Sequence, residues 1–336
     1  MIIKLMNSFF KILFSLHIFL LLLLTSSFSY AQDESFEQWL FSYKEYALKK
    51  GVSKSTIDVA FKNVKFIEKI IKYDRKQPEF FEDTNTYVSK RANLLRVRKA
   101  KELLNKNLEL FNQVEKEFKV EKEILLALWG IETNFGKHVG KMDIISALAT
   151  LSYDKRRSEF FSNQLLILLK LIDKKIVTHD ELFGSWAGAY GNFQFMPSTI
   201  NSYAIDYDNN NVIELKTSLK DSLASAANYI NKIGWMNKTP CFLSVKIKNK
   251  INEKYINKSA RNISHRFSIS KWKKLGIILD ENVDLDHNYK AALILPDGKI
   301  NSPTFLVFNN YEKILNWNRS LRFAISVCTL AEMISS

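Results

Sequence analysis

Beyond about residue 33, apolar positions recur every three or four residues, which is the period of an amphipathic helix. The clearest early set is Phe36, Leu40, Tyr43 and Ala47. Gly51 suits the end of that helix, because glycine readily adopts the left-handed backbone that closes many helices. The same spacing predicts further helices over residues 53–61, 66–73 and 84–120, the last of them in two pieces.

The middle of the chain carries the most apolar helical patterns. Helices are predicted through residues 125–134, 144–151 and 158–172. A loop rich in glycine and aromatic residues follows over 183–196, and Pro197 suits the first turn of the next helix. An Ala-rich helix then runs from 221 and ends at Gly234.

The pattern changes after residue 240. Short apolar or alternating runs predict strands at 241–247, 265–270, 291–295 and 304–307, and residues 311–336 return to helix. We therefore predict a mainly α fold with a small β subdomain (α+β). Its expected parts are an export signal (1–31), an N-terminal helical domain (32–120), a helical core (121–236), a β-rich subdomain (237–310) and a C-terminal helix packing back on the helical part (311–336).

Composition agrees with an ordered helical protein. The 336 residues are 46% hydrophobic, enough for a substantial core, and only 10 Gly and 5 Pro occur. No HExxH metal spacing, phosphate-binding glycine loop or GxSxG nucleophile pattern is present. The sequence therefore gives no sign of a zinc protease, a nucleotide-binding enzyme or a serine hydrolase of the common types.

The first 31 residues are typical of an export signal. Lys4 and Lys11 precede an apolar run over 12–24, and small residues at Ser29 and Ala31 suit cleavage before Gln32. The alternative is an uncleaved membrane anchor, although the apolar run is short for a spanning helix. No Cys lies near this site, so the sequence does not predict a lipoprotein at the N-terminus. We expect a periplasmic protein.

Export changes the meaning of the positive charge. The formal net charge is +14, of which the two lysines of the signal carry +2 and the rest of the chain +12. A basic exported protein meets anionic polymers outside the membrane rather than nucleic acid, although a solvated basic face is the alternative. Cys241 and Cys328 could pair in an oxidising compartment or remain free, because sequence does not report their separation.

Glu132 is an acid within an apolar helical run. On a helix it shares a face with Leu128 and Trp129. Apolar surroundings favour the neutral form of a carboxyl, and a neutral carboxyl can donate a proton to a leaving oxygen near neutral pH. The alternative is a solvated glutamate at the edge of an apolar stripe.

Several long sequence landmarks surround Glu132. They fall at residues 74–80, 129–133, 147–153, 187–191, 194–197, 226–229 and 318–320. In this order they resemble the membrane-bound lytic transglycosylase B type, the lytic murein transglycosylases of glycoside hydrolase family 103. The resemblance runs from about Phe36 to the C-terminus.

This resemblance implies a lysozyme-like helical catalytic core and a peptidoglycan substrate. It implies cleavage of the β-1,4 bond between MurNAc and GlcNAc with formation of 1,6-anhydroMurNAc ends. Glu132 matches the single general acid/base of the family, in contrast to the usual two-carboxylate glycosidases. No second carboxylate lies in the apolar helix. The resemblance requires no cofactor.

The resemblance also implies substrate-binding residues. Ser185 and Gln194 would hold the muramyl residue, and Arg156 and Arg157 would contact peptide or lactyl carboxylates. The sugar subsites would be lined by Phe195, Met196 and Tyr229, with Asn318 reaching back to the cleft. The chain departs from the family at Trp317 and Phe323, where tyrosines are common, so the hydrogen bonds of two phenolic hydroxyls are in question.

Some members of the family carry a calcium loop after the helix that Pro197 begins. The matching ligands would be Asp206, Asp208, Asn210, Val212 and Asp221. Asn210 replaces an acid and no glycine supplies the tight turn, although asparagine tolerates positive φ. A polar turn without metal is the alternative, and both interpretations stay open.

Three functions remain to be distinguished. The leading one is a lytic transglycosylase, and the others are a hydrolytic muramidase that uses water and a non-catalytic peptidoglycan-binding scaffold. The expected partners are glycan strands and their stem peptides, with cell-wall synthesis or division proteins as further candidates. We expect a monomer and no nucleic-acid partner.

Overall fold

The computed structural model describes residues 34–77, 81–279, 286, 288–299 and 301–336, so the predicted export signal lies outside the described residues. The chain divides into two compact units, Met1–Tyr43 and Lys44–Ser336. The described part of the first unit holds the start of α2 (Phe36–Lys49), where the ring of Trp39 stacks on Phe36 and Tyr43. The features below belong to the second unit.

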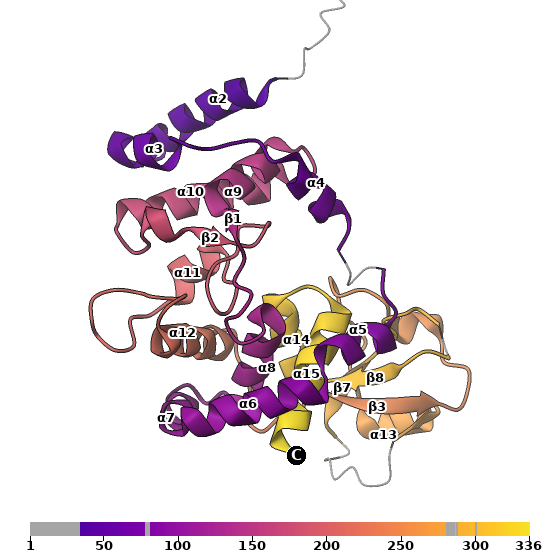
Figure 1. Ribbon diagram of the computed structural model, residues 1–336. Coiled ribbons are helices and arrows are strands. Elements are labelled where there is room, and N and C mark those ends of the chain that lie inside the picture. The colour runs from indigo at the N-terminus through magenta and orange to yellow at the C-terminus, as the bar shows by residue number, and fades with distance from the viewer. Residues whose placement is uncertain (1–33, 78–80, 280–285, 287, 300) are drawn as a thin grey trace, which may run out of the picture. The chain divides into compact units, whose positions relative to one another are not determined.

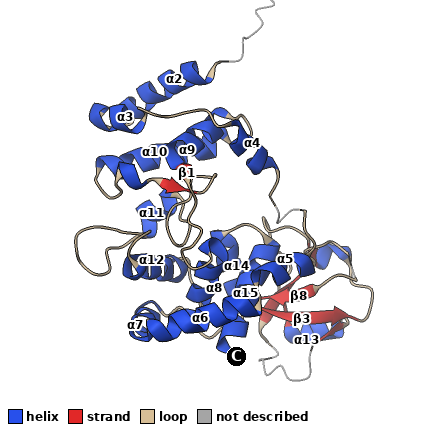
Figure 2. Ribbon diagram, in the orientation of Figure 1, coloured by secondary structure: helices blue, strands red, loops and turns tan. Residues whose placement is uncertain are grey.

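The second unit is mainly helical, as Figure 1 shows by element and Figure 2 by colour. Its α-helices are α3 (Lys54–Ala60), α4 (Glu68–Arg75), α5 (Thr84–Arg91), α6 (Leu94–Lys106), α7 (Leu108–Phe118), α8 (Lys122–Thr133), α9 (Ile144–Tyr153), α10 (Ser158–Asp173), α11 (Pro197–Tyr203), α12 (Leu219–Lys232), α13 (Ile269–Lys274), α14 (Asn309–Trp317) and α15 (Leu321–Ser335). Short 3₁₀ turns are η2 (His179–Glu181) and η3 (Glu253–Tyr255). Within the described residues, every helix is too short or too polar to cross a bilayer.

The strands form a two-stranded ribbon and a six-stranded sheet. They are β1 (Met142–Asp143), β2 (Phe183–Gly184), β3 (Phe242–Ile247), β4 (Ile256–Asn257), β5 (Phe267–Ser268), β6 (Ile277–Ile278), β7 (Lys290–Ile294) and β8 (Thr304–Val307). The larger sheet has the order β4-β7-β8-β3-β6, with β5 also paired to β7, and only the β4–β7 pair is parallel. Trp272 of α13 packs in the core of this sheet and donates its indole N–H to the carbonyl of Ala291 at 2.8 Å.

Helix α8 is the buried helix on which the predicted acid sits. Residues 124–130 are buried, and α8 packs against α15, α6, α7 and α12. Asn134 closes the helix in the left-handed conformation, with φ of 50°. A Cβ on Gly130 would lie 2.8 Å from the ring of Phe135, so this glycine lets that ring fold back onto the helix. Glu132 is thereby fixed in the last turn of a rigid element.

The prediction of a mainly α fold with a small β part is confirmed. Three local predictions are wrong. Residues 84–120 form three helices rather than two pieces, because the side chain of Asn93 caps α6 and Asn107 separates α6 from α7. The C-terminal segment forms two helices, broken at residues 318–320. Strand β5 is only two residues long, since Ser268 caps α13 immediately afterwards.

Candidate active site

Glu132 is half-buried and has a partner from the far end of the chain. Its Oε1 accepts a hydrogen bond from the indole Nε1–H of Trp317, the last residue of α14, at 2.9 Å. An indole nitrogen only donates. The bond therefore marks Oε1 as the acceptor oxygen of this contact.

An aromatic cluster holds Trp317 in place. Its ring centroid lies 5.2 Å from that of Tyr229 and 5.4 Å from that of Phe195. The hydroxyl of Tyr229 donates to the carbonyl of Asn316 at 3.0 Å, and burial raises the pKa of Tyr229 to about 12. This phenol is therefore neutral at physiological pH. The cluster positions the indole that bonds Glu132. Trp317 therefore makes a polar contact at the position where the family resemblance led us to expect a tyrosine.

Phe195 and Met196, two of the predicted sugar-lining residues, are buried to different degrees. Phe195 is only 3% exposed and packs between Phe193 and Trp317. Its ring therefore supports Trp317, and a place in a sugar subsite stays a prediction for Phe195. Met196 is half-buried and occupies the N-cap position of α11.

Asn192 joins α8 to the glycine-rich loop, a role that the sequence did not reveal. Its Oδ1 accepts from the indole of Trp129 at 3.2 Å, and its Nδ2 donates to the carbonyl of Lys216 at 3.1 Å. Its own carbonyl accepts from the hydroxyl of Thr133, next to Glu132, at 2.8 Å. Asn192 is buried, so these bonds are shielded from water. Its position between glycine and phenylalanine in the loop is the only signal that could have marked it.

Ser185 and Gln194 use part of their hydrogen-bonding capacity on the loop itself. The Ser185 hydroxyl accepts from the backbone N–H groups of Ala187 and Ala189 at 3.2 and 3.0 Å. Gln194, with φ of 50°, donates its side-chain N–H groups to the carbonyls of Val139 and Gly191. These bonds leave the Ser185 O–H as a donor and the Gln194 Oε1 as an acceptor for a ligand.

Arg156 and Arg157 are tied to a buried carboxylate that the sequence analysis did not assign. Asp74 is 2% exposed, and its Oδ2 accepts from Arg156 Nε at 2.7 Å. Its Oδ1 accepts from Arg157. The side chains of both arginines are about two-fifths exposed. Asp74 therefore orients the pair, and a ligand carboxylate would meet only their remaining N–H groups.

Three other acids near Glu132 in sequence have structural partners. Asp154 accepts from Arg75 at 2.9 Å, Asp143 caps α9 through the N–H of Ser146, and Asp173 accepts from the hydroxyls of Ser53 and Thr56. These roles agree with a site that depends on one reacting carboxyl. Asn318 follows Trp317 and is half-buried at the break between α14 and α15.

The predicted calcium loop brings three carboxylates together. Oxygens of Asp206, Asp208 and Asp221 lie within 4.8 Å of one another. Asn209 and Asn211 adopt positive φ and so supply the turns that glycine would otherwise provide. Fully buried Asp221 accepts from two backbone N–H groups, those of Tyr207 and Glu214. The donor set and its rigid support fit a hard cation.

The remaining predicted ligands of that loop are less well placed. Asn210 turns its Oδ1 to the N–H of Val212 at 2.8 Å. Both oxygens of Asp206 also accept backbone N–H groups, from Asn210 and Asn211. These bonds preorganise the loop for a cation, and they equally hold the shape of a metal-free polar turn.

Comparison with known proteins places this geometry in a family. The family model described as "Transglycosylase SLT domain" matches residues 35–332. The chain belongs to this transglycosylase family. Membrane-bound lytic murein transglycosylase B of Escherichia coli (strain K12) is 28% identical to it over 236 residues, which are 69% of this chain and 62% of that protein. The match thus spans less than two thirds of that relative's length.

Solved structures of other transglycosylases have the same fold. SltB3 from Pseudomonas aeruginosa, solved in complex with NAG-anhNAM-pentapeptide, is 33% identical with a TM-score of 0.81, covering 90% of this chain and 80% of that one. Slt35 of Escherichia coli, solved in complex with calcium, has a TM-score of 0.74 at 23% identity, covering 88% of this chain and 92% of that one. At that identity the second similarity shows the fold alone.

Proposed function

We propose that this chain is a lytic transglycosylase that cleaves the β-1,4 bond between MurNAc and GlcNAc in peptidoglycan. The observation that carries the proposal is the half-buried Glu132 carboxyl, bonded by one oxygen to a donor-only indole in a fold shared with lytic transglycosylases. The neutral acid donates its proton to the glycosidic oxygen, which departs as the 4-hydroxyl of GlcNAc. The resulting carboxylate then accepts the proton of the muramyl 6-hydroxyl.

The 6-hydroxyl oxygen attacks the anomeric carbon in place of water, so the product is a 1,6-anhydro sugar. The carboxylate returns to its neutral form in the same step, and no external base is needed. Ser185 as a donor and Gln194 as an acceptor suit the hydroxyl and acetamido groups of the muramyl residue. Positive charge at the anomeric carbon is stabilised by oriented dipoles and by the carboxylate itself.

The product mass distinguishes the candidate reactions. Residues 32–336 are incubated with purified sacculi, and the soluble products are analysed by mass spectrometry. A lytic transglycosylase releases anhydro ends, whereas a hydrolytic muramidase releases reducing ends heavier by one water. Binding to sacculi with no released product would instead indicate the scaffold and would overturn the proposed activity.

Trp317→Phe is expected to lower kcat by about tenfold, because it removes one charge-assisted hydrogen bond to the reacting carboxyl. The same loss favours the neutral acid, so the decline of activity at high pH should move to higher pH. The measurement is kcat and kcat/KM against pH on soluble glycan strands. Trp317→Tyr is the matched control, since its hydroxyl can also donate. An unchanged pH profile for Trp317→Phe would contradict this role for the indole.

We further propose that the loop over residues 206–221 holds calcium through Asp206, Asp208 and Asp221, with Asn210 and the Val212 carbonyl as additional ligands. The ion would stabilise the loop that leads into α12. Millimolar calcium is then expected to raise the unfolding temperature by a few degrees relative to chelator, and Asp208→Asn should abolish the increase. Asp58→Asn, at an exposed acid paired with Lys54, is the control. Equal unfolding temperatures with calcium and chelator would favour the metal-free polar turn.

We propose a periplasmic location, which rests on the predicted export signal and on the family of the chain. Glycan strands and stem peptides are the proposed partners. The monomeric state, the division of the chain into domains and any contact with cell-wall synthesis or division proteins stay predictions.

A further inference from the structure

Helix α6 begins with two leucines that face solvent. Leu94 and Leu95 are 64% and 73% exposed, while the opposite side of the helix is buried through Val97 and Ala100. A single exposed leucine is ordinary at a protein surface. Two adjacent exposed leucines at the start of a helix form an apolar patch, and such a patch often marks a contact with another surface.

The same segment is strongly basic. Half of residues 90–101 are lysine or arginine and none is acidic, the basic residues being Lys90, Arg91, Arg96, Arg98, Lys99 and Lys101. Residues three and four apart share a helix face, so Arg98 and Lys101 lie on the exposed side with the two leucines. Leucines surrounded by basic side chains on an exposed helix are typical of segments that lie on a membrane surface.

A cavity of about 400 Å³ lies beside Leu95. Among the described residues that line it, none is acidic and four are lysine or arginine, namely Lys90, Arg96, Lys99 and Lys137. A hollow lined by one sign of charge concentrates ligands of the opposite sign. The cavity therefore offers a place for a small anionic group next to the apolar pair.

Two of the lysines that line the cavity already have acidic partners. Lys90 bonds Glu82 at 2.5 Å, and Lys99 bonds Glu102 at 2.7 Å. Each pair has a well-exposed member, and water weakens the attraction within such pairs. An anionic ligand can therefore compete for these lysines at little cost.

Three further cations have no such partner. For Arg98, Lys101 and Lys137, the described part of the chain places no acidic group within ion-pair range. All three side chains are exposed. We call the surface formed by these three residues, Leu94 and Leu95 the α6 patch. Its three charges are available to anions from outside the chain.

Firm contacts hold the start of α6. Asn93 caps the helix by accepting from the N–H of Arg96 at 3.0 Å. The Arg96 side chain donates to the carbonyl of Gly130 in α8 at 3.1 Å, and to the carbonyls of Lys90 and Arg91 at 2.8 and 2.9 Å. The α6 patch is therefore anchored to a buried helix and is a defined surface rather than a loose loop.

The α6 patch is separate from the proposed reacting group. Gly130, which accepts from Arg96, and Glu132 lie two positions apart on α8 and hence about 200° apart around the helix axis. Helix α6 therefore packs on the side of α8 that the Glu132 side chain does not face. A partner bound at the α6 patch is thus distinct from a substrate bound at Glu132.

We propose that the α6 patch docks this protein on a membrane surface that carries anionic phospholipids. Leu94 and Leu95 enter the boundary between headgroups and acyl chains, and Arg98, Lys101 and Lys137 pair with lipid phosphates. The cavity beside Leu95 receives one headgroup. This contact needs no lipid attached to the N-terminus, and the inference is independent of the proposed reaction.

A lipid surface fits the α6 patch better than a glycan strand or a free anionic polymer does. Sugar rings stack on aromatic faces, and residues 88–110 contain no aromatic side chain. A free anionic polymer would meet the three cations but would leave the two leucines in water. A surface that offers both anionic groups and an apolar layer accounts for both parts of the patch.

Co-sedimentation with vesicles tests the inference. Residues 32–336 are mixed with vesicles of phosphatidylcholine alone or of phosphatidylcholine with phosphatidylglycerol, and the bound fraction gives a partition coefficient. We expect partitioning onto the anionic vesicles to be about tenfold stronger, because several basic side chains act together near the charged surface. Added salt should weaken it, since salt screens this attraction.

Two double variants separate the apolar part of the patch from the charged part. Leu94→Ser/Leu95→Ser and Arg98→Gln/Lys101→Gln are each expected to lower partitioning onto anionic vesicles about tenfold. All four side chains are exposed, so both variants should unfold at nearly the temperature of the unmodified protein.

The matched controls lie in the β-rich part of the chain. Ile278→Ser changes an apolar side chain of β6 that is 46% exposed, and Lys248→Gln/Lys250→Gln removes two charges from exposed positions. Both controls should keep most of the partitioning.

Equal partitioning onto both kinds of vesicle would overturn the inference. Undiminished partitioning of the leucine variant would do the same, because the cations would then attract any polyanion without entry of the patch into a lipid surface. Failure of the proposed function would instead appear as a lack of anhydro products from the unmodified protein and would leave vesicle binding intact.

Discussion

Glu132→Gln is expected to lower the release of anhydro products by about a thousandfold, the largest change of activity for any single substitution in this chain. Glutamine has the same shape, and its carbonyl oxygen can still accept the indole N–H of Trp317. It cannot donate a carboxylic proton or take one back. The substitution therefore removes both proton transfers while the hydrogen bond that positions the side chain persists.

The measurement is the initial rate of anhydromuropeptide release from sacculi, with the unfolding temperature recorded in parallel. Glu123→Gln is the matched control, since Glu123 lies in the first turn of the same helix. The control should keep nearly full activity. If Glu132→Gln remained fully active while folded, another group would have to be the acid.

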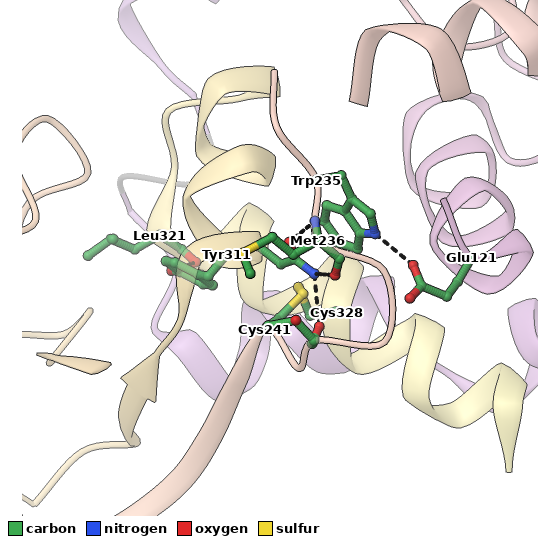
Figure 3. Close-up of a disulfide and its surroundings, with 9 residues drawn as sticks. Glu121, Trp235, Met236, Cys241, Tyr311, Leu321 and Cys328 are labelled. Carbon is green, nitrogen blue, oxygen red and sulfur yellow. Dashed lines mark hydrogen bonds between the residues drawn. A yellow bond between two sulfur atoms is a disulfide. The ribbon is translucent and has the colours of Figure 1, made fainter. Parts of the chain in front are cut away.

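The loss of the disulfide between Cys241 and Cys328 is expected to have the largest effect on stability. The structure joins these cysteines, whose Cα atoms lie 6.1 Å apart and which are separated by 87 positions. Figure 3 shows the bond between the Trp235–Glu121 contact and the Tyr311–Leu321 contact. Closing a loop of this length restricts the unfolded chain by roughly 4.5 kcal/mol in the chain-entropy model. The sequence had left the pairing open.

Cys241→Ala/Cys328→Ala should therefore lower the free energy of unfolding by about 3–4 kcal/mol, as measured by denaturant titration. A reductant should reduce the stability of the unmodified protein towards that of the variant and should leave the variant unchanged. Thiol titration of the unfolded protein without reductant should detect no free thiol from this pair. Two reactive thiols, or a stability that is insensitive to both treatments, would contradict the bond.

The sequence sufficed for elements whose signals are local. An unbroken apolar run predicts α8, and Pro197 together with the glycine-rich loop before it predicts the start of α11. The helix and strand boundaries that were predicted wrongly depend on weak local signals that compete with the hydrophobic period. The caps at Asn93 and Ser268 are single hydrogen bonds, and nothing in the hydrophobic period announces them.

In the candidate site, too, some side chains are held by local contacts and others by contacts between distant parts of the chain. Ser185 and Gln194 lie in one short loop, and the turns of that loop hold both side chains through bonds to nearby backbone. The burial of Phe195 follows from its contact with Trp317, which no local pattern of the sequence reports. Asp74, more than eighty positions away, likewise determines which N–H groups of Arg156 and Arg157 remain available to a ligand.

By itself the sequence determined the family of this protein, the helical class of its fold and the placement of an acid in a rigid apolar helix. Only the tertiary structure decided which oxygen of Glu132 accepts the indole N–H and whether Cys241 and Cys328 are joined. The physical reason is distance along the chain. Helical period and turn chemistry act over a few residues, whereas the Trp317–Glu132 bond joins residues 185 positions apart and exists only once the helices have packed.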